Sequence, residues 1–157
     1  MTITLILVGK TDNRHLEALI SDYKKRLSHF VNFEISIIPD LKKRKNMEIE
    51  LQKEKEGELI LKKISNSDFV VLLDEKGSEY SSTKLAGWLQ KRMNTGLKNL
   101  VFVIGGPYGF SPDVYSRGDQ KVSLSKMTFS HQMIRLFFTE QLYRAFTILG
   151  NLPYHHE

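Results

Sequence analysis

A glycine-rich loop follows the most apolar run of the chain and is the first candidate for a binding site. Residues 100–104 are continuously apolar, and the sequence Gly-Gly-Pro-Tyr-Gly comes directly after them, at 105–109. Glycine has no Cβ, so its main chain can approach a ligand closely and can adopt positive φ. The pattern indicates a ligand-binding loop, with a tight turn imposed by packing as the alternative.

Several other motifs that would do chemistry are incomplete. Thr4 stands where a phosphate-binding P-loop ending at Gly9-Lys10 needs its first glycine, and Pro107 replaces the second glycine of a dinucleotide-binding loop. The chain has no cysteine, and its five histidines form no H-E-x-x-H pattern. We therefore expect no disulfide, no metal site and no nucleotide-binding loop of these types.

The charge balance favours a polyanionic partner. The formal net charge is +5, and nucleic acid is the commonest partner of such a basic surface. Lys126, Arg135 and Arg144 are candidates for an RNA-facing patch, while the basic run at 42–45 suits phosphate contact and a solvated face equally well. No run is long enough to span a membrane and residues 1–8 lack a basic leader, which predicts a cytoplasmic protein.

The hydrophobic pattern defines the elements that must position these residues. Short β-rich runs occur at 3–8, 33–38, 69–73, 100–104 and 122–124, and helical spacing occurs at 16–27, 82–93 and 131–149. Alternating strands and helices predict an α/β fold, a mostly parallel sheet with helices on both faces. We expect one domain over residues 1–157, with its site beyond the carboxyl ends of the strands.

Three segments, taken in order, carry a resemblance to a known family. They are residues 102–109, 123–131 and 140–155, and the run Leu-Leu-Asp-Glu-Lys-Gly at 72–77 also fits. Together they resemble the ribosomal RNA large subunit methyltransferase H family, within the SPOUT methyltransferases. The resemblance extends over the whole chain, from Met1 to Glu157.

The resemblance implies a fold and an activity that the spacing did not show. The C-terminal part would thread into a trefoil knot, and the protein would be a homodimer that binds S-adenosyl-L-methionine in the knot without a metal. The reaction would methylate N3 of a pseudouridine in large-subunit (23S) rRNA on the assembled ribosome.

The resemblance also implies which residues of this chain contact the cofactor, and they lie at or after the ends of strands. Loops leave main-chain N–H and C=O groups free to read an adenine. We expect Gly105→Val to lower cofactor affinity, through lost main-chain approach and a disallowed φ, while the fold is kept. The implied contacts are Leu73, Gly105, Leu124, Ser125, Lys126, Met127, Thr128 and Phe129.

Proton transfer and charge stabilisation suggest catalytic candidates. His131, His155 or a bound water could take the proton of the target nitrogen, and Arg135 or Arg144 could stabilise the uridine oxygens. Tyr154, aimed by Pro153, could stack on a base. Helix N-terminal packing is the alternative for His131, and a structural salt bridge is the alternative for each arginine.

The chain departs from the family pattern at three positions, and its last helix is rich in aromatic residues. His156 stands where many members carry arginine, and Lys126 and Gln132 replace smaller residues or proline. Phe137, Phe138 and Tyr143 suggest a dimer face on the last helix. The competing functions are a methyltransferase of the same fold that acts on tRNA, and a ribosome-binding factor without chemistry.

Overall fold

Five parallel strands form one sheet in the computed structural model, which describes residues 1–42 and 44–156. The strands are β1 (Thr2–Val8), β2 (Asn32–Ile38), β3 (Phe69–Glu79), β4 (Asn99–Ile104) and β5 (Gln120–Ser123), in the order β2-β1-β4-β3-β5. Every neighbouring pair is parallel. The carboxyl ends of all five strands therefore lie at one edge, as the strand pattern predicted.

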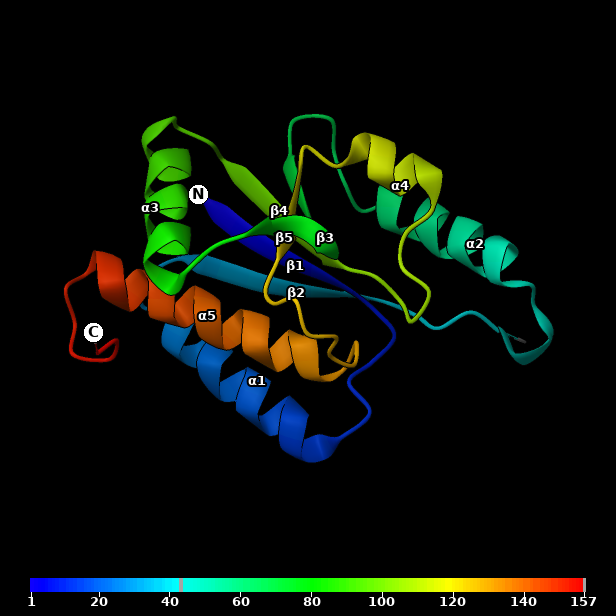
Figure 1. Cartoon of the computed structure of the whole chain (residues 1–157), viewed down its shortest axis with the longest axis horizontal. Coiled ribbons are helices and arrows are strands. Elements are labelled where there is room, and N and C mark those ends of the chain that lie inside the picture. Colours follow the sequence, from blue (N-terminus) through cyan, green and yellow to red (C-terminus); the bar gives the residue numbers. More distant parts are fainter. Residues whose placement is uncertain (43, 157) are drawn as a thin grey trace.

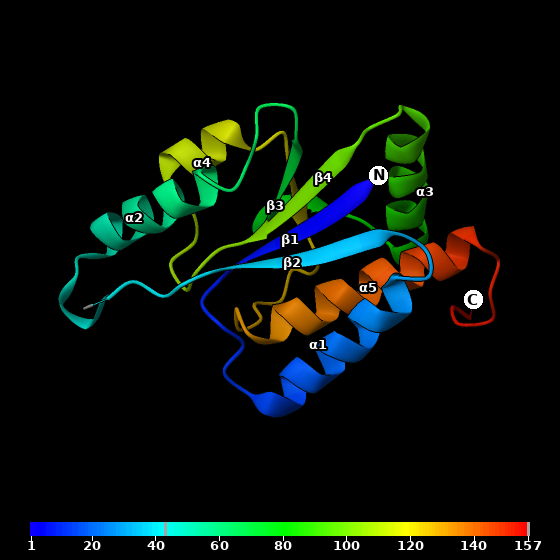
Figure 2. The same ribbon diagram turned by 180° about the vertical axis from the view of Figure 1, so that it is seen from behind.

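Helices cover both faces of the sheet, which confirms the predicted α/β architecture (Figures 1 and 2). One face carries α1 (Arg14–Leu27), α3 (Ser82–Asn94) and α5 (Met133–Leu149), and its core includes Phe102, Phe138 and Leu142. The other face carries α2 (Ile49–Leu61) and α4 (Pro112–Arg117), packed over Val101 and Val103. A short 3-10 turn, η1 (Arg44–Asn46), precedes α2.

Two helices, α2 and α4, were absent from the predicted pattern. The buried face of α2 is largely polar and includes Gln52, Glu56 and Gly57, so no apolar stripe marks it. A signal for α4 was present, because Ser111 caps it by accepting from Val114 N–H and Pro112 occupies its first turn.

The later part of β3 lies directly against the main chain of β5. Val122 pairs with Leu73 and again with Ser78, across a shift in register. A Cβ on Gly77 would come within 2.5–2.7 Å of main-chain atoms of Lys121 and Val122, so only glycine permits this approach. The strand thus continues to Glu79, past the turn predicted at residues 74–77; the implied trefoil knot stays a prediction.

Candidate functional site

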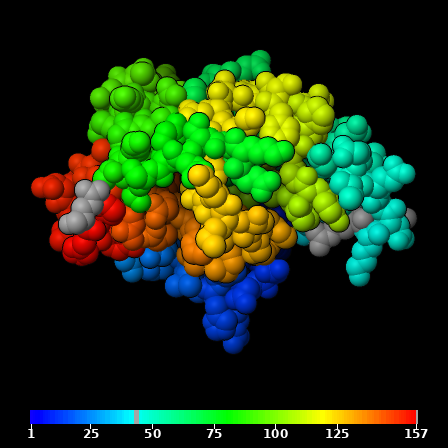
Figure 3. All heavy atoms as spheres, in the orientation of Figure 1, coloured from blue at the N-terminus to red at the C-terminus, as the bar shows by residue number. Residues whose placement is uncertain are grey.

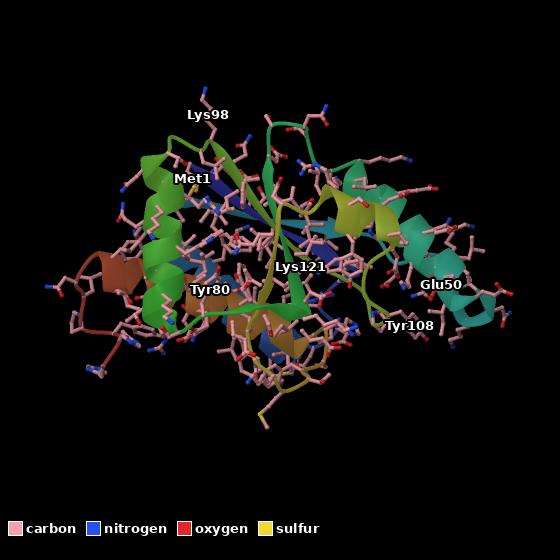
Figure 4. All side chains as sticks on the ribbon, turned by 45° about the horizontal axis from the view of Figure 1, so that its top comes forward. Met1, Glu50, Tyr80, Lys98, Tyr108 and Lys121 are labelled. Atoms are coloured by element: carbon pink, nitrogen blue, oxygen red, sulfur yellow. The ribbon has the colours of Figure 1, made fainter. Side chains whose placement is uncertain are left out.

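A pocket of about 190 Å³ opens at the carboxyl edge of the sheet. The sheet register sets its floor, because Leu73 of β3 pairs with both Ile104 of β4 and Val122 of β5. Figure 4 shows Tyr108, which follows β4, far from Met1 and Lys98, which precede β1 and β4 at the opposite edge. The carboxyl edge, where the pocket opens, is the edge at which ligands bind in open parallel sheets.

Most of the predicted cofactor residues line this pocket. The segment after β5 lies at the molecular surface beside the residues that follow β3 and the start of α5 (Figure 3). The lining includes the predicted cofactor residues Leu73, Gly105, Leu124, Ser125, Met127, Thr128 and Phe129, together with the catalytic candidate His131. Lys126 is exposed and is the one predicted cofactor residue outside the lining. Sequence reasoning missed Asp74, Glu75, Ile104, Gly106, Val122, Ser123 and Ile134.

Serine side chains shape the irregular segment between β5 and α5. The Ser123 hydroxyl donates to the carbonyl oxygen of Ser125 at 2.8 Å, and the Ser125 hydroxyl accepts from Met127 N–H at 2.9 Å. The Ser130 hydroxyl accepts from Met133 N–H at the start of α5. These local bonds replace strand and helix pairing, so the segment turns around the pocket.

The glycine loop is a closed turn, but Gly105 differs from its prediction. Gly109 N–H donates to the carbonyl oxygen of Gly106, and Gly109 has a φ of 81°. Gly105 does not have a positive φ, and a Cβ there would meet the ring of Phe110 at 3.1 Å. The expectation of a disallowed φ in Gly105→Val was wrong: valine would instead collide with the packed ring of Phe110.

Acidic side chains supply the fixed negative charge of the pocket. Asp74 and Glu75 line it, and His131 is the only other titratable side chain among the described lining residues. Asp74 is half-buried, and its Oδ2 accepts a hydrogen bond from the Tyr115 hydroxyl at 2.5 Å. A chain with a net charge of +5 thus presents carboxylates here, which suits a ligand that carries positive charge.

Arg135 does not line the pocket, contrary to the role expected for it. Its side chain is fully buried, and it donates to the carbonyl oxygens of Val8 (2.7 Å), Gly9 (2.9 Å) and His131 (3.0 Å). The donors of this guanidinium are thus taken up by main-chain carbonyl oxygens, and Arg135 is not among the residues that line the pocket. It ties the start of α5, and with it His131, to the end of β1.

Tyr154 and His155 follow the carboxyl end of α5, whereas the pocket is lined by residues at the start of that helix, and the tail that carries Tyr154 and His155 is pinned. Figure 1 shows the C-terminus beside the carboxyl end of α5. The Tyr154 hydroxyl donates to Glu140 Oε1 at 2.9 Å and lies 3.1 Å from the Tyr23 hydroxyl. The Arg144 guanidinium lies over the Tyr154 ring, pairs with Glu140 and approaches His155 Nδ1 at 3.2 Å. Burial, together with Tyr23 and Glu140, raises the pKa of Tyr154. Arg144 thus makes the salt bridge considered as its alternative role.

An exposed apolar cluster borders the pocket. It consists of Met127, Phe129, Met133 and Phe137, and the rings of Phe129 and Phe137 are 4.9 Å apart. Two of the three aromatic residues predicted for a dimer face lie elsewhere. Phe138 is a core residue against Phe102, and Tyr143 packs among Tyr23, Phe30 and Tyr154.

Two further features concern the described part of the chain only. None of its helices combines the length and the apolar character needed to span a membrane. The same residues contain no cluster of three or more His, Cys, Asp or Glu side chains able to hold a metal ion.

Comparison with known proteins gives concordant matches over the whole length. A family model described as "Predicted SPOUT methyltransferase" matches residues 1–155. The protein named ribosomal RNA large subunit methyltransferase H of Christiangramia forsetii is 68% identical over 99% of both chains. Proteins of the same name from Flavobacterium psychrophilum and Phocaeicola vulgatus are 61% and 57% identical over 100% of both chains.

Proposed function

The chain belongs to the SPOUT methyltransferase family, and from this premise we propose that it transfers a methyl group from S-adenosyl-L-methionine to N3 of a pseudouridine in large-subunit (23S) rRNA. The names of its relatives support the large-subunit rRNA as substrate. The observation that carries the cofactor is the pocket at the carboxyl edge, with its apolar floor and acidic side chains. The ribosomal substrate in turn supports a cytoplasmic location.

The residues of the pocket fit S-adenosylmethionine. Its adenine is a flat ring that suits the apolar side chains of Leu73, Ile104 and Ile134, and the irregular segment 124–129 offers main-chain groups that can read the ring edge. Its sulfonium and ammonium groups suit the carboxylates of Asp74 and Glu75. We retain the eight predicted cofactor contacts, with Lys126 acting through its main chain.

Catalysis rests on orientation and on removal of one proton. When bound, S-adenosylmethionine supplies an electrophilic methyl group on a positively charged sulfur. The chain itself must align the target nitrogen and accept its proton. His131 lines the pocket and is our candidate acceptor, with a bound water as the alternative. Arg135 positions His131 through its carbonyl oxygen and touches no substrate.

The position of the tail supports a homodimer. Because α5 has 17 residues, it is about 25 Å long, and it separates Tyr154 and His155 from the pocket of their own chain. In a dimer, the tail of one protomer can reach the pocket of its partner and supply an aromatic ring and an imidazole there. The exposed apolar cluster of Met127, Phe129, Met133 and Phe137 offers a surface for that contact.

The two competing functions make different demands on the pocket. A ribosome-binding factor without chemistry has no use for a site with carboxylates and apolar walls, so the lining of the pocket argues against it. A methyltransferase of the same fold acting on tRNA would use the same pocket, and only the identity of the methylated RNA separates it from our proposal.

Calorimetric titration with S-adenosylmethionine tests the cofactor assignment. We expect saturable binding at one site per chain. The His131→Ala variant should still bind but should lose methyl transfer, because His131 is assigned to proton transfer. Absence of binding to the wild-type protein would favour the binding factor. Binding without methyl transfer to ribosomal subunits, but with transfer to tRNA, would favour the other enzyme.

A further inference from the structure

Asp74 is held rigidly at the border of the pocket. It follows Leu73 at the point where β3 stops pairing with β4. Its Oδ1 accepts from Lys76 N–H at 2.8 Å, and its Oδ2 accepts from the Tyr115 hydroxyl at 2.5 Å. Both carboxylate oxygens are therefore fixed by donors outside the pocket, and the charge is presented in one orientation.

Tyr115 is itself held in place, on α4. Its ring packs edge-on against Phe110 at 5.6 Å, and the ammonium of Lys121, labelled in Figure 4, lies 5.6 Å from the ring centroid. Phe110 in turn packs against Gly105 of the pocket. Burial and the charge of Asp74 raise the pKa of Tyr115 to about 12, so its hydroxyl stays a donor at physiological pH.

Methyl transfer changes the charge of the ligand in this pocket. The bond between the methyl carbon and sulfur breaks and leaves its electron pair on sulfur, and a bond forms from that carbon to the ring nitrogen, whose proton goes to the base. The sulfonium becomes a neutral thioether. A half-buried carboxylate attracts the sulfonium, and this attraction is lost when the product forms.

We propose that Asp74, positioned by Tyr115, is the specificity-determining residue that favours the sulfonium donor over the thioether product in this pocket. The proposal rests on the proposed function, since it assumes that the pocket binds S-adenosylmethionine. Its consequence is faster exchange of spent for fresh cofactor. Glu75 also lines the pocket, but it is exposed and so better screened by water.

The test compares two ligands that differ only in the methyl group and its charge. The affinities of S-adenosylmethionine and S-adenosylhomocysteine are measured by calorimetry for the wild type, Asp74→Asn, Tyr115→Phe and the control Asp113→Asn. Asp113 is an exposed carboxylate of α4 outside the pocket lining. General damage lowers both affinities together, whereas loss of the carboxylate weakens only the preference for the donor.

We expect Asp74→Asn to reduce the ratio of donor to product affinity about fivefold, a size typical of a partly screened charge pair. Tyr115→Phe should reduce it by less, and Asp113→Asn should leave it unchanged. An unchanged ratio in Asp74→Asn, with both ligands bound, would overturn the inference and leave the proposed function standing. A wild type that binds neither ligand would overturn both.

A measurement on the wild type keeps the test independent of folding in the variants. Added salt screens charge pairs, so it should weaken S-adenosylmethionine binding more than S-adenosylhomocysteine binding. Equal weakening of the two ligands would contradict a role for the Asp74 charge.

Discussion

Arg135 Nη1 donates a hydrogen bond of 2.9 Å to the carbonyl oxygen of Gly9, which lies 126 positions earlier in the chain. The bond joins the first turn of α5 to the end of β1. Burial lowers the pKa of the guanidinium, and the charges of Asp12 and Asp40 oppose this effect. The side chain therefore has a structural role: it holds the start of α5, which borders the pocket, against the end of β1.

Replacing Arg135 should lower the free energy of unfolding, and its effect on methyl transfer should follow from that loss of stability. Arg135→Met leaves the buried carbonyl oxygens of Val8 and Gly9 without donors, which should lower the free energy of unfolding by about 2–5 kcal/mol. The exposed Arg14→Met is the control, expected to stay within about 0.5 kcal/mol. Urea unfolding measures both. Normal stability with abolished methyl transfer would restore the direct catalytic role first expected for Arg135.

Sequence patterns predicted the parts of the fold and site that local chemistry determines. The five strands are apolar runs. Their alternation with helices along the chain was enough to predict a parallel sheet with its site at the carboxyl ends of the strands. The segment 124–129 could be assigned because the family resemblance covers it. The pocket lining contains five of these six residues, all except Lys126, and their contacts with the cofactor stay a prediction.

Features that depend on distant partners could not be predicted in this way. Arg135 is buried where its guanidinium donates to the carbonyl oxygens of Val8 and Gly9, at the end of β1. The spacing of the residues around Arg135 in the sequence does not reveal these partners. Glu56 is buried in α2 against Gly106, a contact between segments 50 positions apart. The pinning of Tyr154 by Glu140 and Tyr23 likewise requires the folded chain.

The contact between Gly77 and β5 predicts that alanine substitutions at Gly77 and Gly87 change stability in opposite directions. Gly77→Ala places a methyl group against the main chain of Lys121 and Val122, so it should destabilise by about 2 kcal/mol and weaken cofactor binding. Gly87→Ala, in α3 with no atom within 4 Å of the added Cβ, should stabilise by about 0.5–1 kcal/mol. Thermal unfolding compares them, and equal effects would contradict the described packing.

Tyr115 should ionise at a higher pH than an unfolded tyrosine, and this should make the stability of the fold depend on pH in the alkaline range. An unfolded tyrosine titrates near pH 10, whereas burial and Asp74 raise the pKa of Tyr115 to about 12 in the folded protein. Its contribution to stability is thus fully present below about pH 10 and is lost as the pH rises towards 12. Ultraviolet titration of tyrosinate should lose a late-ionising group in Tyr115→Phe; loss of a group that titrates near pH 10 would contradict this.

Removal of the tail should separate binding from catalysis. Deletion of residues 154–157, of which Glu157 lies outside the described residues, should leave dimerisation and S-adenosylmethionine affinity nearly intact and remove most methyl transfer to ribosomes. The control His156→Arg should be tolerated, because His156 is exposed. Sedimentation, calorimetry and transfer assays measure the three properties. Wild-type transfer by the truncated enzyme would remove Tyr154 and His155 from the catalytic set.

The substrate assignment is tested most directly by mass spectrometry of rRNA nucleosides from a deletion strain and from the same strain complemented with the wild-type gene. We predict that a methylated pseudouridine of 23S rRNA is absent from the deletion strain and returns on complementation. Its presence at the same level in both strains, or the loss of a methyl group from tRNA alone, would contradict the assignment.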